Sequence, residues 1–325
     1  MLRRRQIFLA GLTAITLSLS ACGGSGADGN GSGPEKTKLV VGTLPVPDAA
    51  PLFIAIQKGF FKEEGLTVKP EIVPNGPASG PKLQAGTMDF SLANYVSAFV
   101  ATSKGALKWR FVADSYRAGP NTFVLLAPKD ANTRKVEDLK GKTIAVASLK
   151  SINTIAIASL LEAHGLKETE VKFKELPFPQ MPAALKTKQV DVVCVTEPTN
   201  TVIQSQQGTV AVADIMTGAT ESFPVAGWAT LEPYVRKYPK TIAAFQRAMS
   251  KAQKIAATDR RSVEQVLPTY TQIKPDTASV ITLGTFPTSL NSIALQRVPD
   301  LLLKFGYIPS RIDAKTLIVP EPSAK

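Results

Sequence analysis

Short runs of apolar and β-branched residues alternate with stretches of helical periodicity from residue 37 to about residue 230. This alternation is typical of βαβ units, in which helices cover a mostly parallel sheet. Near 123–128 and 225–230, extended segments are expected to cross between two lobes. The sequence therefore predicts an α/β chain with two lobes, each a mostly parallel sheet flanked by helices, and two hinge crossings. The predicted strands are 38–43, 67–73, 88–92, 109–113, 122–127, 143–147, 171–175, 190–195 and 210–213.

After residue 231 the pattern becomes helical. A helix is expected to begin at Pro239, with apolar residues in steps of three and four at Ile242, Phe245, Met249 and Ala252. That spacing gives a helix one apolar face toward a core. The other predicted helices are 51–59, 82–85, 95–103, 154–163, 263–270, 277–283 and 292–305.

The first 22 residues have the features of an export signal. Arginines at positions 3–5 precede an apolar stretch over 7–19, which is too short to span a bilayer as a helix. The run Leu19-Ser20-Ala21-Cys22 resembles the lipobox of bacterial lipoproteins, so residues 1–21 are expected to be cleaved and Cys22 to carry lipid. The alternative is a buried cysteine after a short helix. Arg4-Arg5 weakly resembles a twin-arginine signal, which leaves both export routes open.

Residues 23–34 are rich in Gly and Ser, a composition that makes a flexible linker. We therefore expect a tether over 22–36, a first lobe over 37–125 and 228–325, and a second lobe over 126–227.

The composition narrows the classes of function. The net charge is +12, but no block of five like charges is present and no basic–aromatic interleaving, so nucleic-acid binding is not expected. A basic protein suits a place beside an anionic membrane. One histidine and two cysteines predict no metal site and no cofactor. Cys194, inside the apolar run 190–195, is interpreted as a small core residue.

Several motifs together resemble one family. Lys58-Gly59-Phe60-Phe61 with Glu64-Gly65-Leu66, the run 83–90, the run 138–146 and Glu197-Pro198 are similar, in order and spacing, to the nitrate/sulfonate/taurine and thiamine-precursor solute-binding proteins of ABC importers. The similarity covers roughly residues 38–260.

The resemblance implies the two-lobed periplasmic-binding-protein fold of type II, closing over a solute by a hinge movement. It also implies a monomer that delivers a small solute to ABC permease subunits. With Cys22 lipidated, the protein is expected on the outer face of the cytoplasmic membrane. Loops and helix N-termini that follow strands are where such folds bind ligands.

In the first lobe, the strand-end residues Asp48 and Ala49 are expected to face the solute, with helix capping as the alternative for Asp48. Asn94 and Tyr95 follow another strand and offer hydrogen bonds and a stacking face, although Tyr95 can equally pack in the lobe. Asn75 is interpreted as a turn residue.

In the second lobe, Ser148, Ser151 and Asn153 lie in a strand-to-helix turn and are expected to supply polar contacts. Glu197 ends another strand; it is expected to point into the cleft, with an N-cap or hinge ion pair as the alternative.

Asn121 at the first crossing and Trp228 at the second are also expected to contact solute, and Trp228 as a core residue is the alternative.

The expected solute is a small molecule with an anionic or planar polar group, like a sulfonate, taurine or a pyrimidine. Asp48 and Glu197 together indicate that it also carries a donor, such as an amine or a pyrimidine amino group. Nitrate is disfavoured because two carboxylates would repel it. Two other classes remain: an enzyme like the thiamine-pyrimidine synthases of the same fold, and a sensory lipoprotein without a transport role. The chain lacks the histidine and cysteine-rich segment of such a synthase, so no catalytic residue is assigned.

Overall fold

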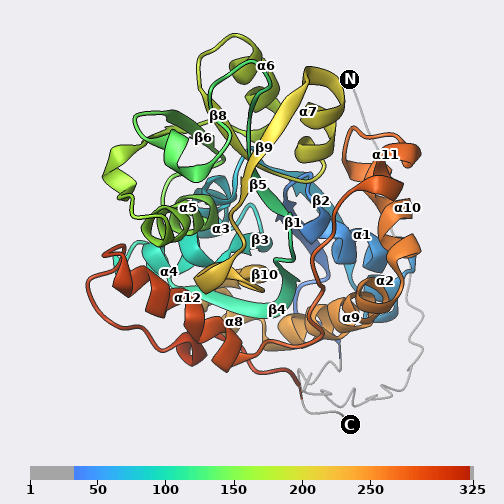
Figure 1. The fold of residues 1–325 in the computed structure, drawn as a ribbon. Coiled ribbons are helices and arrows are strands. Elements are labelled where there is room, and N and C mark those ends of the chain that lie inside the picture. Colours follow the sequence, from blue (N-terminus) through green and yellow to red (C-terminus); the bar gives the residue numbers. More distant parts are fainter. Residues whose placement is uncertain (1–32, 323–325) are drawn as a thin grey trace, which may run out of the picture. The chain divides into compact units, whose positions relative to one another are not determined.

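The computed structural model describes residues 33–322 (Figure 1). The predicted signal segment, Cys22 and most of the tether lie outside these residues. The described strands form two five-stranded sheets, in the orders β2-β1-β3-β10-β4 and β7-β6-β8-β5-β9. The strands are β1 (Lys38–Thr43), β2 (Thr67–Ile72), β3 (Phe90–Asn94), β4 (Trp109–Arg117), β5 (Phe123–Pro128), β6 (Thr143–Val146), β7 (Lys172–Glu175), β8 (Val192–Thr196), β9 (Thr209–Asp214) and β10 (Pro224–Leu231). We call the first sheet with its helices the first lobe, and the second sheet with its helices the second lobe.

Each sheet is mostly parallel, as predicted, but contains one strand that runs against the other four. In the first sheet β1 pairs in parallel with β2 and β3, whereas β10 is antiparallel to β3 and β4. The second sheet repeats this pattern, with β5 antiparallel to β8 and β9. The reason is that β5 and β10 each begin where the chain arrives from the other lobe. They start at the edge where β3 and β8 end, so they run in the opposite direction.

The chain passes between the lobes over residues 118–122 and 215–223. The segments 123–128 and 225–230, predicted as crossings, are strands of the sheets, and the expected lobe boundaries fall inside β5 and β10. Nearly every residue of these two strands is buried, as in a strand covered on both faces. The two crossings are bonded to each other, because the Ala118 amide donates to the Phe223 carbonyl at 2.9 Å.

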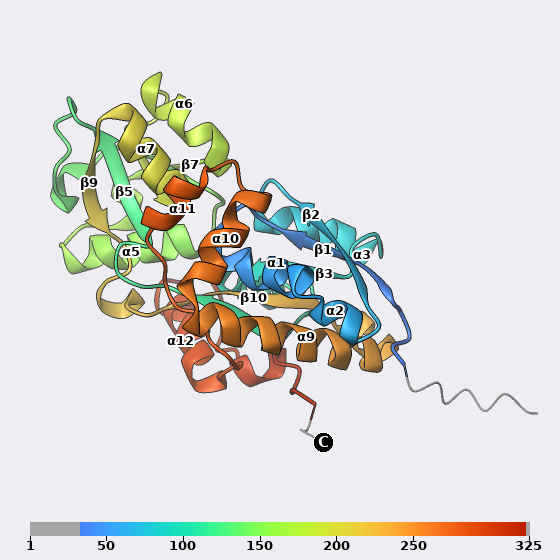
Figure 2. The same cartoon turned by 90° about the vertical axis from the view of Figure 1, so that its right-hand side faces the viewer.

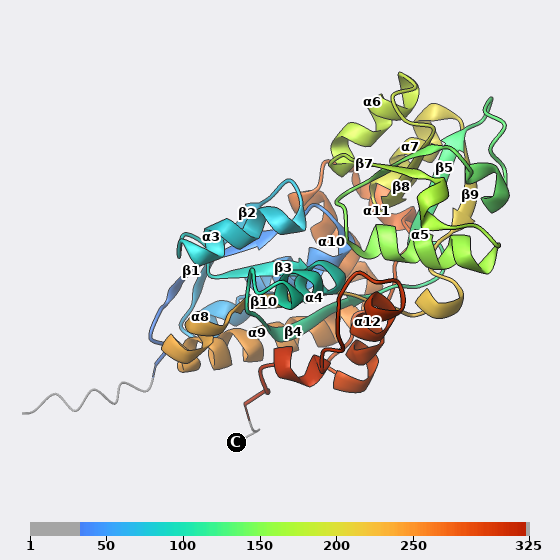
Figure 3. The same ribbon diagram turned by 90° about the vertical axis from the view of Figure 1, so that its left-hand side faces the viewer.

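Helices cover both faces of the first sheet. On one face α1 packs against α9 and α10 (Figure 2), and on the other α4 packs against α12 and β10 (Figure 3). The helices are α1 (Ala50–Gln57), α2 (Phe60–Glu63), α3 (Ser79–Gln84), α4 (Tyr95–Ser103), α5 (Ile152–Ala163), α6 (Met181–Lys186), α7 (Thr199–Gln207), α8 (Glu232–Lys237), α9 (Pro239–Thr258), α10 (Arg260–Tyr270), α11 (Pro275–Val280) and α12 (Ser292–Lys304). None of the helices within residues 33–322 has the length and apolar character needed to span a bilayer.

The apolar face predicted for the helix beginning at Pro239 is confirmed in α9. Ile242, Phe245, Met249 and Ala252 are all buried. The Phe245 ring stacks on Phe90 of β3 with the centroids 4.0 Å apart. Burial of such rings stabilises the contact between α9 and the sheet.

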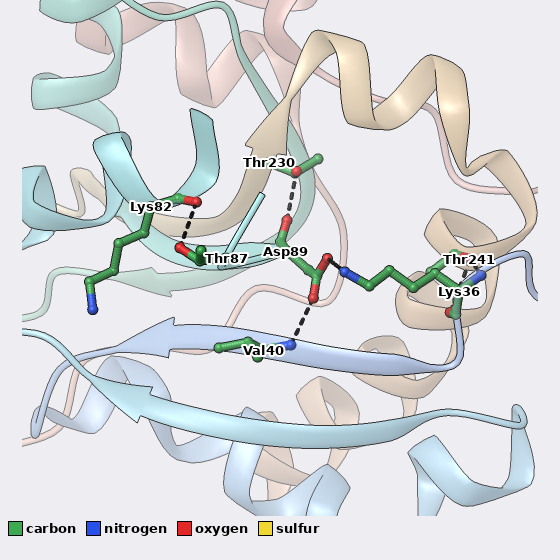
Figure 4. Close-up of polar contacts among 7 residues, drawn as sticks. All are labelled: Lys36, Val40, Lys82, Thr87, Asp89, Thr230 and Thr241. Atoms are coloured by element: carbon green, nitrogen blue, oxygen red, sulfur yellow. Dashed lines mark hydrogen bonds and ion pairs between the residues drawn. The ribbon is translucent and has the colours of Figure 1, made fainter. Parts of the chain in front are cut away.

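A buried carboxylate ties the first described residues to the first sheet (Figure 4). The Asp89 side chain, which is 2% exposed, accepts hydrogen bonds from the Lys36 ammonium at 2.5 Å and the Val40 amide at 2.8 Å. The Asp89 carbonyl accepts a third bond from the Thr230 hydroxyl at 2.7 Å. These bonds join β1, β3 and β10 close to the first residues of β1 and β3.

Candidate functional site

A cavity of about 70 Å³ lies between the two lobes. Its lining comes from segments that follow β1, β2 and β6, from the last residues of β3 and β8, from the first residues of β5 and β10, and from Phe178. The carboxyl ends of parallel strands collect at one edge of a sheet, which is why residues so distant in sequence meet here. The lining residues are Leu44, Val46, Asp48, Asn75, Gly76, Pro77, Leu92, Asn94, Phe123, Ala147, Ser148, Ser151, Ile152, Asn153, Phe178, Thr196, Val225 and Ala226.

Asp48 is the one charged residue of this lining. It belongs to a short 3-10 helix, η1 (Pro47–Ala49), that joins β1 to α1. Its side chain is buried, and its Oδ1 atom has no hydrogen-bond partner among the described residues. Burial raises the pKa of Asp48 to about 7, since the carboxylate loses its hydration and gains no compensating cation. A solute group that donates a proton or carries positive charge would satisfy this oxygen.

The opposite wall is the turn from β6 into α5. The Ser151 hydroxyl donates to the Ser148 carbonyl at 2.7 Å, and the Ser151 amide donates to the Thr154 hydroxyl at 3.1 Å. Ser151 therefore shapes the start of α5, as serine commonly does at an N-cap. The first turn of a helix presents N–H groups without partners inside the helix, together with the positive end of the helix dipole. This wall suits an acceptor or an anionic group.

Amide side chains complete the polar lining. The Asn94 Oδ1 accepts from the Ser97 amide at 3.3 Å and caps α4, while its Nδ2 donates to the Val225 carbonyl at 3.1 Å. The Asn153 Nδ2 donates to the Cys194 sulfur at 3.1 Å. Each amide is thus held in one orientation before any solute arrives.

Cys194 is a core residue, as predicted. It is fully buried on β8, and burial raises the pKa of its thiol to about 12. The thiol is therefore neutral at physiological pH and is a poor nucleophile.

Five of the predicted contact residues come together in the lining: Asp48, Asn94, Ser148, Ser151 and Asn153. Ala49 is fully buried beside Asp48 and does not line the cavity. Asn121 lies exposed in the first crossing, where its backbone N–H donates to the Asp214 carboxylate at 2.7 Å.

Tyr95 and Trp228 point into the first lobe instead of the cavity, which is the alternative that the sequence left open for each. The Tyr95 hydroxyl donates to the buried Asp114 carboxylate at 2.8 Å, and its ring packs against Phe111. Trp228 is fully buried in β10. Both aromatic side chains gain more from burial in the core than the edge of a cavity offers them.

Glu197 is also outside the lining, although it directly follows the end of β8. Its carboxylate accepts hydrogen bonds from the Thr201 amide at 3.1 Å and the Thr201 hydroxyl at 3.0 Å, at the start of α7. It also accepts from the Thr282 amide at 3.1 Å, beyond α11. The carboxylate is therefore occupied by capping α7 and by tying it to the C-terminal segment.

The apolar part of the lining was not predicted. Phe123 begins β5, and Phe178 begins the short helix η5 (Phe178–Gln180) after β7. The prolines on both sides of Phe178 indicate a loop, but nothing in the sequence shows that this loop borders the cavity. Asn75, interpreted as a turn residue, does cap the helix η2 (Gly76–Ala78) by accepting from the Ala78 amide at 3.1 Å, and it lines the cavity as well.

Two α/β lobes with a polar cavity where their strand ends meet define the class of the two-lobed periplasmic binding proteins. The alkanesulfonate-binding protein SsuA of Xanthomonas axonopodis has a similar structure, with a TM-score of 0.73 and 18% identity over 88% of this chain and 99% of that chain.

The NMT1-like family model matches residues 32–267, and the chain belongs to this family. A curated relative, the nitrate/nitrite binding protein NrtA of a Nostoc species, is 25% identical over 67% of this chain and 54% of its own length. A putative thiamine biosynthesis protein of Haemophilus influenzae is 30% identical over 49% of this chain and 49% of its own length. The chain spans between 37% and 56% of the length of three of the curated relatives it matches.

Proposed function

We propose that the protein is an extracytoplasmic receptor of an ABC importer that captures a small solute between its lobes and delivers it to the permease. It acts as a monomer, anchored through Cys22 to the outer face of the cytoplasmic membrane. The fold and the similarity to the nitrate/nitrite and alkanesulfonate binding proteins support a binding role. The solute leaves the site unchanged, because the protein acts through binding and closure.

The solute carries an N–H donor that faces Asp48 and an acceptor or anionic group that faces the first turn of α5. The unpartnered Oδ1 of Asp48 is the observation that carries this proposal. An unsatisfied buried acceptor costs the folded protein roughly 1–3 kcal/mol, and a donor from the solute recovers that free energy. Aminosulfonates such as taurine and aminopyrimidines both have this arrangement of groups.

Nitrate remains disfavoured as the solute, although one carboxylate and not two would repel it. Only one carboxylate, that of Asp48, lines the cavity, because Glu197 does not. No lysine, arginine or histidine is found in the lining, so a bare anion would meet a negative group without a compensating cation.

A binding panel tests the solute class. Purified protein is screened by thermal shift and calorimetry against taurine, alkanesulfonates, aminopyrimidines, carboxylates and nitrate. A compound with both groups should raise the melting temperature in a concentration-dependent way. It should be recovered chemically unchanged. Binding of nitrate or an alkanesulfonate without any amine binder would contradict the solute class, and conversion of the compound would indicate an enzyme.

A further inference from the structure

A second hollow, much larger than the cavity, lies between the lobes. This groove of about 700 Å³ is bordered by Pro45 and Ile72 of the first lobe, by Phe178 and Val202 of the second, and by Ile273 between α10 and α11. Most of its border is apolar, and Lys274 is its one charged residue. No function has so far been assigned to it.

The groove adjoins the cavity at Phe178, which borders both hollows. The neighbours Leu44 and Pro45 border the cavity and the groove respectively, and Thr196 and Pro198 do the same. A substituent on a molecule held in the cavity would therefore reach the groove by passing the Phe178 side chain.

The groove also leaves apolar surface facing water. The Ile72 side chain, at the end of β2 on the border of the groove, is 50% exposed. Covering such a surface with a hydrocarbon group is favourable in proportion to the area removed from water. The cavity has about a tenth of the volume, and Asp48 and the turn before α5 are the parts of its lining that suit polar groups.

We propose that the solute is amphiphilic: its polar head, with the N–H donor, occupies the cavity, and an apolar tail passes Phe178 and lies in the groove. This inference rests on the proposed function, since it places the head at Asp48. The groove then sets the specificity for the tail, while Asp48 and the α5 turn set the specificity for the head.

Calorimetry with two series of compounds tests the proposal. One series is 4-aminopyrimidine with n-alkyl groups of zero to six carbons at ring position 5, and the other is taurine with the same alkyl groups on its nitrogen. The affinity should rise by about two- to fourfold for each methylene in at least one series, as burial of hydrocarbon predicts.

Two variants identify the groove as the location of the tail. Ile72→Gln and Ile273→Gln should each flatten the dependence of affinity on chain length and leave the affinity of the unsubstituted head unchanged. Ile293→Gln is the matched control, because Ile293 lies on α12, is 82% exposed and does not border the groove. It should behave like the unaltered protein.

The outcomes separate this inference from the proposed function. If an unsubstituted head binds but neither series gains affinity with length, or if the gain persists unchanged in both groove variants, the inference is wrong and the proposed function stands. If no member of either series binds, the proposed solute class fails, and the inference fails with it.

Discussion

At the scale of single residues, two buried carboxyl groups differ in their hydrogen-bond partners. Asp114 accepts hydrogen bonds from the Tyr95 hydroxyl at 2.8 Å and the Ser115 amide at 2.9 Å. The Asp48 Oδ1 has no such partner among the described residues. Burial nevertheless raises the pKa of each carboxyl to about 7. The difference suits a structural role for Asp114 and a binding role for Asp48.

These raised pKa values predict how stability depends on pH. In the unfolded chain both carboxyls ionise near pH 4, whereas in the folded protein they keep their protons until about pH 7. The folded state therefore holds more protons between these values, and its stability falls as pH rises through this window. Each group contributes about 1.4 kcal/mol per pH unit.

Asp48→Asn should roughly halve this dependence between pH 5 and 6.5, because Asp114 remains. Urea unfolding at several pH values in that range measures it. An unchanged slope would show that Asp48 ionises normally in the folded protein. The same variant should weaken binding of an amine-bearing solute by tenfold or more, since the ion pair is lost.

At the scale of elements, the start of α7 is held by one side chain. Glu197 accepts three hydrogen bonds from Asn200 and Thr201 in the first turn of α7, and one from Thr282 beyond α11. A carboxylate at a helix N-terminus also interacts favourably with the helix dipole. Glu197 thus couples the second lobe to the C-terminal segment. That segment in turn pairs with β4, through mutual backbone bonds of Arg117 and Thr285 at 2.9 and 3.0 Å.

Glu197→Gln should lower the free energy of unfolding by about 1–3 kcal/mol, because an amide nitrogen cannot accept the bonds that a carboxylate oxygen accepts. The affinity for solute should stay within about twofold, since Glu197 does not line the cavity. Denaturant unfolding and calorimetry measure the two effects. Asp48→Asn is the matched control, because it makes the same change from carboxylate to amide but should weaken the binding of solute. A comparable loss of affinity in both variants would place Glu197 in the site.

At the scale of the whole molecule, the cavity depends on the approach of the two lobes. It is lined by both, and near it the Ser97 hydroxyl of α4 donates to the Lys150 carbonyl of the second lobe at 3.3 Å. Two chain crossings connect the lobes covalently, and hydrogen bonds such as Ser97–Lys150 and Thr282–Glu197 link them as well. A connection of this kind permits hinge movement, in which binding favours the closed arrangement.

Saturating solute should therefore reduce the radius of gyration measured by small-angle X-ray scattering. Asp48→Asn at the same solute concentration should show a smaller reduction, because a smaller fraction of the variant is bound. Equal radii for the free and loaded protein, with binding verified by calorimetry, would show that capture does not require closure.

Parts of the site were predictable and parts were not. Ser148, Ser151 and Asn153 were found because a buried strand and an apolar helix define the turn that holds them. Asn94 and Tyr95 are adjacent in sequence at the end of β3, yet only Asn94 lines the cavity. Position at a strand end locates a side chain near the site, but the direction in which it points depends on partners such as Asp114 that are distant in sequence.

The alternation of strands and helices, the apolar face of α9 and the family can be predicted without a structure, because they depend on local periodicity and short motifs. The directions of β5 and β10 become clear only from the folded chain, since direction in a sheet follows from where the chain enters it. The same holds for Glu197 as a cap and for Asp48 as an acid whose Oδ1 has no partner among the described residues. The two carboxylates occupy similar positions in the sequence pattern, and only contacts such as that of Glu197 with Thr282, 85 residues away, distinguish them.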